Sequence, residues 1–202
     1  MNKRLLICMI LFGAVARPAF AEPAHVASRN WALIGGPNSV EFLATGKPGF
    51  LQMTGRGAHP EGQFQFTENA REKVLSGSFK VNLNDFDTGI QKRNEHMKSK
   101  YLETDKFPTA QLFISEMRLP AENLPLKEKE LPFKGRLNLH GVEKEISGLA
   151  LVSMNGQEAS ADVKFSIHIT DFKIAIPVFL GVTVADKVDI NARILARAQE
   201  SK

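Results

Sequence analysis

The stretch of sequence that decides the fold is Leu75–Ser115, LSGSFKVNLNDFDTGIQKRNEHMKSKYLETDKFPTAQLFIS. From Leu75 to Asn84, apolar or small residues alternate with polar ones, and this period of two predicts a strand with one buried face. Asp87 and Thr88 then offer side-chain oxygens of the kind that cap helix starts. The stretch therefore predicts a strand that leads directly into a helix.

The helix is expected over Gly89–Glu103. Ile90, Met97 and Tyr101 have the spacing of residues that share one side of a helix. Proline disfavours helical geometry in the residue before it, so the pattern ends ahead of Pro108. Strand alternation then resumes with Ala110, Leu112 and Ile114. One charged helix is thus set between two strands.

Alternating apolar residues, separated by Gly and Pro, predict further strands on both sides of this stretch. The expected strands are Val40–Ala44, Phe50–Gly55, Gln63–Thr67, Val74–Leu83, Ala110–Met117, Leu131–Leu139, Glu143–Ser153, Ala159–Thr170 and Val182–Ala196. Asn155-Gly156 predicts a hairpin turn, and Lys127–Glu130 is interpreted as a solvated loop or a strand start. Many half-buried strands with one helix indicate a sandwich or a closed barrel, and alternation alone does not choose between them.

Met1–Ala21 has the pattern of a secretory signal peptide. Lys3 and Arg4 precede an apolar core, and small residues lead up to a cleavage point before Glu22. The apolar run is too short to cross a bilayer as a permanent helix, which favours cleavage over a short N-terminal anchor. We expect export to the periplasm and a single mature domain over residues 22–202.

Removal of the leader leaves the mature chain almost neutral. The full sequence has 26 Lys and Arg against 22 Asp and Glu, and the leader holds three of the basic residues and no acidic one, which leaves 23 against 22. Nucleic-acid binding needs a clustered basic face, so no nucleic-acid partner is expected. The one cysteine, Cys8, lies in the leader, which excludes disulfides, thiol nucleophiles and cysteine metal sites from the mature domain.

Several motifs resemble the YceI-like family of bacterial secreted lipid-binding domains, from about Trp31 to about Arg197. The matching motifs are Asp87-Thr88-Gly89, Arg93-Asn94-Glu95-His96-Met97, Tyr101-Leu102, Lys106-Phe107-Pro108-Thr109-Ala110, Ser39-Val40-Glu41-Phe42, Gly77-Ser78-Phe79 and Gly135-Arg136-Leu137-Asn138-Leu139-His140-Gly141-Val142. Two residues depart from the family pattern: Asn94 stands where Asp is common, and Lys173 where Gly is frequent.

The resemblance implies a mainly β chain folded as an antiparallel, lipocalin-like β-barrel of about eight strands with one helix alongside. A barrel of this size can enclose one small ligand. The ligand implied is an amphiphile with a long apolar tail: a polyisoprenoid, an isoprenoid quinone or a fatty-acyl lipid. The partners implied are this lipid, a membrane in transient contact, a cytochrome b561-type membrane protein and a second copy in a homodimer. Neither a metal nor a cofactor other than a bound lipid is expected.

Long apolar ligands need a concave apolar wall with few polar groups, and the apolar positions of this chain are rich in phenylalanine. The apolar residues that we expect to contact a ligand are Phe79, Val81, Phe113, Leu137, Phe165, Ile167, Phe172 and Phe179. The alternative is that these side chains fill the barrel as ordinary core, in a stress-related structural or interaction protein without a lipid ligand.

Two further features concern the rim of the barrel. The rim segment, residues 171–184 (DFKIAIPVFLGVTV), breaks alternation at Pro177 and Gly181 and is interpreted either as a rim loop or as a flexible apolar lid. Arg93 and His96 share a helix face, where Arg93 offers a planar fork to a phosphate or carboxylate head group. We favour the alternative that both are structural, with Arg93 paired to Glu41 or Asp87.

The sequence argues against an enzyme. It lacks the spacing of a zinc-binding HExxH motif, a nucleophile elbow and a glycine-rich phosphate loop. An isomerase or hydrolase acting on a lipid stays open as a third class of function. It would require titratable groups that converge inside the barrel, and Arg93, His96 and His140 are the candidates. No catalytic residue is assigned.

Overall fold

The computed structural model describes residues 27–47, 49, 51–68, 73–120 and 125–199. The predicted signal peptide lies outside these ranges. The strands are β1 (Ala27–Leu33), β2 (Ser39–Lys47), β3 (Leu51–Ala58), β4 (Glu61–Glu68), β5 (Lys73–Asn82), β6 (Thr109–Leu119), β7 (Leu126–Leu139), β8 (Val142–Asn155), β9 (Glu158–His168), β10 (Val178–Phe179) and β11 (Val182–Ala198). The helical elements are η1 (Leu83–Asp85), α1 (Gln91–His96), η2 (Met97–Tyr101) and η3 (Ile169–Phe172).

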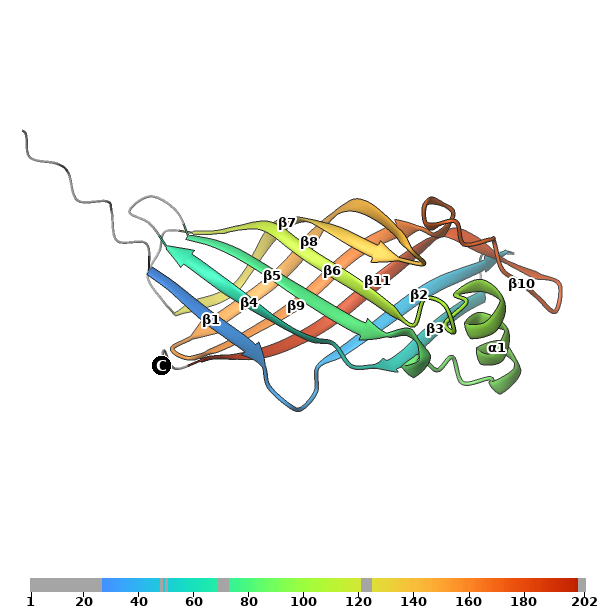
Figure 1. Ribbon diagram of the computed structural model, residues 1–202, viewed down its shortest axis with the longest axis horizontal. Coiled ribbons are helices and arrows are strands. Elements are labelled where there is room, and N and C mark those ends of the chain that lie inside the picture. Colours follow the sequence, from blue (N-terminus) through green and yellow to red (C-terminus); the bar gives the residue numbers. More distant parts are fainter. Residues whose placement is uncertain (1–26, 48, 50, 69–72, 121–124, 200–202) are drawn as a thin grey trace, which may run out of the picture.

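Eight strands form a closed antiparallel ring in the order β1, β4, β5, β6, β7, β8, β9, β11, and the pairing of β1 with β11 closes it. Strand β2 pairs with an earlier part of β11, between Thr183 and Arg193, than β1 does, and β3 pairs with β2, so these two strands extend the wall. Figure 1 shows a long barrel with α1 and β10 at one end, which we call the helix end. The predicted eight-stranded barrel with one helix alongside is confirmed, and the sandwich is excluded.

Period-two burial places one face of each long strand inside the barrel. In β7, residues 131, 133, 135, 137 and 139 are buried, and the residues between them are exposed. Adjacent strands continue the pattern because their register is set residue by residue, as in the pairing of Leu137 with Leu112 and of Leu131 with Ala150. A shift of one residue would turn every apolar side chain outward, so the alternation in the sequence decides which side chains face the interior.

Two strands of the structure were not expected. Strand β1 was not expected, because ASRNWAL does not alternate; its pairing with β4 and β11 makes it a strand. Strand β10 is only two residues long, too short for a periodic signal. Strand β7 begins at Leu126, so of the two alternatives for Lys127–Glu130 the exposed start of a strand is confirmed, and the solvated loop is not. The expected β8–β9 hairpin is present, with Asn155 paired to Glu158.

The helical segment covers residues 91–101, two residues shorter at each end than expected. Its N-cap is Ile90, which makes no side-chain capping hydrogen bond, so the predicted capping by Asp87 and Thr88 is wrong. Ile90 lies outside the helix and is 45% exposed, and it does not share a buried side with Met97 and Tyr101. The last turn is π-helical, with the Leu102 N–H donating to the Met97 carbonyl at 2.9 Å.

Two clusters of buried side chains make up the core. One surrounds Trp31, which is 1% exposed and stacks on Phe64 with ring centroids 5.8 Å apart. The other, at the helix end, includes Phe86 and Phe172. Here Gly55 leaves room for the Phe42 ring, because a Cβ at Gly55 would lie 2.0 Å from that ring. Side chains from both clusters line the cavity described next.

Candidate functional site

The barrel encloses an apolar cavity of about 280 Å³. Its wall includes Phe64 and Val163 from the cluster around Trp31, and Leu137 and Ile167 from the cluster at the helix end. A water molecule takes up about 30 Å³ in the liquid, so this cavity has room for roughly nine. Such a volume argues against an interior filled by its own side chains.

Polar side chains in the cavity wall gather at the helix end. Thr88, Arg93, His96 and Tyr101 all line the cavity and all come from residues 88–101. Ser160, which also lines it, lies on β9 opposite Leu195, near the pairing of β1 with β11. The wall between these ends is aliphatic and aromatic. The surface that the wall presents to the cavity is apolar throughout, so these polar residues line it with their carbon atoms, and the Arg93 guanidinium is part of the hydrogen-bonded helix end.

Hydrogen bonds among residues 87–94 hold the polar end of the cavity in shape. The Asp87 carboxylate accepts from the Gly89 N–H at 2.7 Å and from Asn94 Nδ2 at 2.6 Å, and these two bonds, in that order, hold the pKa of Asp87 below its usual range. Asn94 Oδ1 accepts from the Thr88 N–H at 2.8 Å. Arg93 donates from Nε to Thr88 Oγ1 at 2.9 Å and from Nη2 to the Thr88 carbonyl at 2.6 Å.

The rim segment closes over the helix end. Ile174 and Pro177 line the cavity, and Val178 and Phe179 form β10 against β11. Tyr101 Oη accepts from the Val178 N–H at 3.0 Å and lies 3.3 Å from the Val178 carbonyl, to which it donates. One phenol thus fastens the helix to the rim segment. The interpretation as a rim loop fits this hairpin; whether it acts as a lid stays a prediction.

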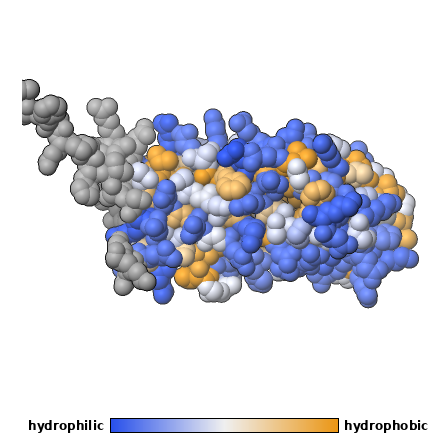
Figure 2. Space-filling view, viewed as in Figure 1, coloured by the Kyte–Doolittle hydropathy of each residue, from blue (hydrophilic) through white to orange (hydrophobic). Residues whose placement is uncertain are grey.

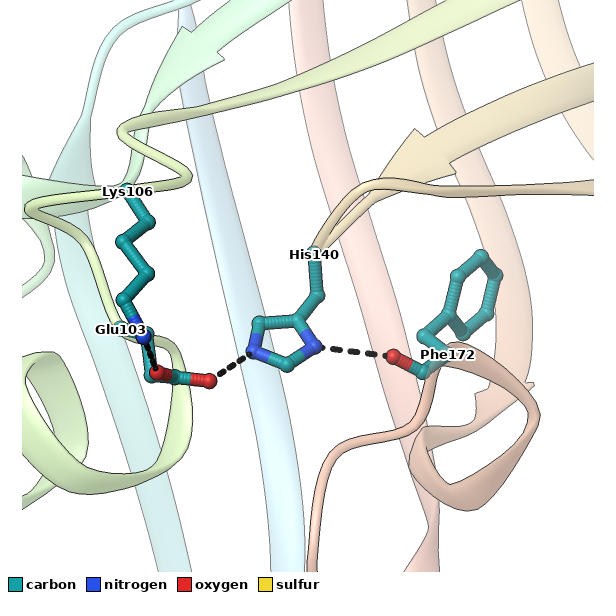
Figure 3. Close-up of polar contacts among 4 residues, drawn as sticks. All are labelled: Glu103, Lys106, His140 and Phe172. Carbon is teal, nitrogen blue, oxygen red and sulfur yellow. Dashed lines mark hydrogen bonds and ion pairs between the residues drawn. The ribbon is translucent and has the colours of Figure 1, made fainter.

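A buried histidine makes a second link between the helix and the rim segment (Figure 3). His140 is 9% exposed; its Nδ1 lies 3.0 Å from the Phe172 carbonyl and its Nε2 lies 3.0 Å from Glu103 Oε2. Both partners are acceptors, so the bridge is complete when both ring nitrogens carry hydrogen. Lys106 and then His140 hold the pKa of Glu103 below its usual range by hydrogen bonding.

Seven of the ten residues expected to contact a ligand line the cavity. They are Phe79, Val81, Leu137, Phe165, Ile167, Arg93 and His96. Phe113 does not, because it lies between Leu112 and Ile114, whose side chains face inward; its ring instead lies near the Arg136 guanidinium, 6.0 Å away. Phe172 is 1% exposed and packed in the core outside the cavity wall. The side chain of Phe179 lies outside the described part of the structure.

Sequence reasoning missed much of the cavity wall. Small residues on β9 and β11, among them Ala161 and Ala192, leave the space that larger side chains would fill. Met97 and Tyr101 complete the wall from the helix. The period-two pattern placed these alanines on the inner face, and a search for small inward residues would have found them.

The three candidates for a catalytic group do not converge. Arg93 and His96 line the cavity, whereas His140 is outside its wall and is engaged by Glu103 and Phe172. Within the described ranges, His, Cys, Asp and Glu side chains form no group of three or more that could hold a metal ion. Those ranges also contain no helix with the length and apolar character needed to cross a membrane.

Comparison with known proteins supplies the family. The model of the YceI-like domain matches residues 31–196, most of the chain. The chain belongs to the YceI-like family. Among curated proteins none matches this chain.

Solved structures with the same fold share little sequence with this YceI-like protein. BcnA of Burkholderia cenocepacia has 18% identity and a TM-score of 0.62, over 78% of this chain and 95% of that one. A polyisoprenoid-binding domain from Saccharophagus degradans, implicated in plant cell wall breakdown, has 16% identity and a TM-score of 0.61, over 87% and 100%. At such identities the likeness shows the fold.

The two departures from the YceI-like pattern both have a structural consequence. Asn94 donates its amide hydrogen to Asp87, a bond that an aspartate carboxylate could not make. Lys173 has a φ of 59°, in the left-handed region where glycine is favoured because it has no Cβ. The family's frequent glycine would suit this position without strain. Asn94 and Lys173, the two residues that depart from the family pattern, both lie in segments that form the helix end of the barrel.

Proposed function

We propose that this YceI-like protein is a periplasmic carrier that holds an amphiphile in its barrel, with the apolar tail in the cavity and the polar head at the helix end. The ligand classes proposed are a polyisoprenoid, an isoprenoid quinone or a fatty-acyl lipid. The observation that supports the proposal is the cavity itself, which is apolar along its whole length and has the polar residues Thr88, Arg93, His96 and Tyr101 in its wall at one end. Binding is reversible and needs no catalytic group.

Tail length decides whether such binding is tight. Each methylene removed from water contributes about 0.8 kcal/mol, so ten contribute about 8 kcal/mol. Association costs about 4–15 kcal/mol in lost freedom before any net affinity appears. A short-chain amphiphile therefore does not bind usefully, and a polyprenyl or long acyl chain does. The head contributes selectivity: Arg93 favours a phosphate or carboxylate through paired hydrogen bonds.

Exchange of this cargo requires contact with a membrane or with another lipid-handling protein. We propose transient contact with a membrane, and a cytochrome b561-type membrane protein as a partner if the ligand is a quinone. A homodimer is the oligomeric state to test beside these. The leader, Met1–Ala21, directs export of the carrier to the periplasm and is then removed.

The test is native mass spectrometry of the mature protein purified gently from a bacterial periplasm, followed by organic extraction. The expected result is one bound lipid mass per chain. A matched pair of variants locates it. Ala161→Phe with Ala192→Phe fills the cavity and should abolish the bound mass. Leu149→Phe with Leu151→Phe, at exposed positions on β8, should retain it.

A wild-type protein that stays at its bare polypeptide mass when polyisoprenoids, quinones and fatty acids are offered would overturn the carrier. The alternative is then a structural or interaction protein. Circular dichroism of the cavity-filling variant shows whether the loss of lipid comes from a filled cavity or from a lost fold. A variant that keeps its lipid with Phe at both positions would place the ligand outside the cavity.

A further inference from the structure

The hairpin formed by β10 and the start of β11 presents apolar side chains to water at the helix end. Val178 pairs with Thr183 and Phe179 with Val182, which leaves Leu180 and Gly181 as a two-residue turn. Leu180 is 87% exposed and Val178 is 52% exposed. Figure 2 shows hydrophobic residues at the end of the molecule where Figure 1 places β10. The tip of this hairpin contributes little to the core.

The backbone at the tip is also unfavourable for its residues. Leu180 has a φ of 50° and Gly181 a φ of 79°, the conformation that two-residue hairpin turns use and for which Asn-Gly is the preferred sequence. A leucine in the left-handed region is strained. Backbone strain and an exposed apolar side chain thus coincide at Leu180, and neither stabilises the folded chain. Such costs are typical of a position kept for binding.

The helix beside this tip is basic. Tyr101 Oη bonds to the backbone of Val178, and Lys100 Nζ lies 5.4 Å from the centre of the Tyr101 ring. Residues 91–101 contain four basic side chains and one acidic one, a net charge of +3. The rim segment up to the tip adds Asp171 and Lys173, which cancel. Apolar side chains flanked by a tyrosine and lysines are typical of segments that lie in a membrane interface.

We propose that the β10–β11 hairpin is the element that docks the protein on an anionic phospholipid bilayer, with Leu180 and Val178 inserted among the acyl chains. This inference rests on the proposed function, because docking here brings the polar end of the cavity against the bilayer that supplies or receives the lipid. The basic helix is attracted to anionic head groups, as juxtamembrane lysines are. Two apolar side chains give weak and reversible attachment, as a carrier requires.

The docking experiment is co-sedimentation of the mature protein with sucrose-loaded vesicles of phosphatidylcholine containing phosphatidylglycerol. Leu180→Asn is the test variant, because asparagine suits the left-handed turn position and should not disturb the fold. Loss of one apolar side chain from the membrane should lower vesicle partitioning about tenfold. Leu149→Asn removes another exposed leucine, 44% exposed on β8, and should partition like the wild type. Binding should weaken on vesicles of phosphatidylcholine alone and at high salt.

Equal partitioning of Leu180→Asn and the wild type, or no vesicle binding by the wild type, would overturn this docking assignment. A wild type that dimerises through Leu180 and ignores vesicles would assign the hairpin to a second copy and would equally overturn it. Native mass spectrometry separates this result from the carrier proposal, since Leu180 does not line the cavity. We expect the Leu180→Asn variant to keep its bound lipid while it no longer binds vesicles. A wild type that binds vesicles but carries no lipid would contradict the carrier proposal and leave the docking proposal intact.

Discussion

Arg93 has two environments at once, the loop before its helix and the wall of the cavity. It pairs with neither Glu41 nor Asp87, the partners expected for a structural role; Glu41 instead pairs with Arg56 at 3.3 Å. Among the described residues its side-chain hydrogen bonds go to Thr88, so a structural role is present with a different partner. Arg93 also lies in the cavity wall, and because its bonds to Thr88 fix its orientation, contact with a bound head group would cost little further ordering.

Glu103 makes the helix end sensitive to acid. Its Oε1 accepts from Lys106 Nζ at 2.6 Å and its Oε2 from His140 at 3.0 Å, and its pKa is lowered from 4.5. A carboxylate whose folded pKa is lowered stabilises the fold above its unfolded pKa, and this contribution is lost as pH falls through the folded value. We expect Glu103→Gln to be less stable than the wild type at neutral pH, with the difference shrinking below about pH 4.5. Urea denaturation midpoints across this range measure it.

Asp87, Asp186 and Asp189 also have lowered pKa values, so the wild type and every variant lose stability in acid. The contribution of Glu103 is therefore the difference in stability between Glu103→Gln and the wild type at each pH. Lys106→Met removes the largest cause of the shift at Glu103 and should reduce the acid dependence in the same direction. A difference between Glu103→Gln and the wild type that stays constant from neutral to acid pH would contradict the assignment.

The strands whose residues alternate were predicted from the sequence. The elements that depend on pairing with other strands or on side-chain packing were missed. Alternation located the inner face of β6 through Ala110, Leu112 and Ile114. Phe113 was expected to contact a ligand because it is aromatic, although its position between Leu112 and Ile114 places it on the outer face. β1 has no period of its own and becomes a strand only because β4 and β11 supply partners. The helix start was also decided by packing: Asp87 accepts from the Gly89 N–H and from Asn94, and Thr88 bonds to Asn94 and Arg93, so neither caps the helix.

The link between the helix and β10 depends on one phenol, so we expect Tyr101→Phe to loosen the rim segment selectively. The variant removes the acceptor of the Val178 N–H and the donor to its carbonyl but keeps the ring in the cavity wall. A neutral hydrogen bond contributes about 0.5–1.5 kcal/mol, so exchange of the Val178 amide hydrogen with deuterium should accelerate roughly 2- to 10-fold. Hydrogen–deuterium exchange with peptide resolution measures this.

The internal reference for this experiment is the centre of β8, where Val152 is buried and paired with Ala161. Its exchange rate should not change in Tyr101→Phe. Unchanged exchange at Val178 as well would mean that pairing with β11 alone holds the hairpin, and that the phenol does not fasten the helix to the rim.

At the scale of the whole molecule, the hollow interior is the feature that the sequence left open. Phenylalanines such as Phe79 and Phe165 are compatible with a filled or an open barrel, because the free volume depends on how all inward side chains pack together. Small residues in the same wall contribute to the free volume: Ala161 and Ala192 line the cavity and are too small to reach across it. The family resemblance favoured an open interior before any packing was known, and the cavity agrees with it.

Closure of the barrel depends on Trp31, which joins the first and last strands of the ring. It pairs with Phe64 on β4 and with Ala198 on β11, and its ring packs on Phe64 and Phe66. Its indole N–H is buried without a hydrogen-bond partner among the described residues. We therefore expect Trp31→Ala to lower the free energy of unfolding by about 3–5 kcal/mol and Trp31→Phe by only about 1–2 kcal/mol, because the phenyl ring keeps most of the packing and no hydrogen bond is lost. Guanidinium denaturation measures both. Equal costs for the two variants would contradict this expectation, because they would mean that a phenyl ring restores none of the packing that the indole provides between β1 and β11.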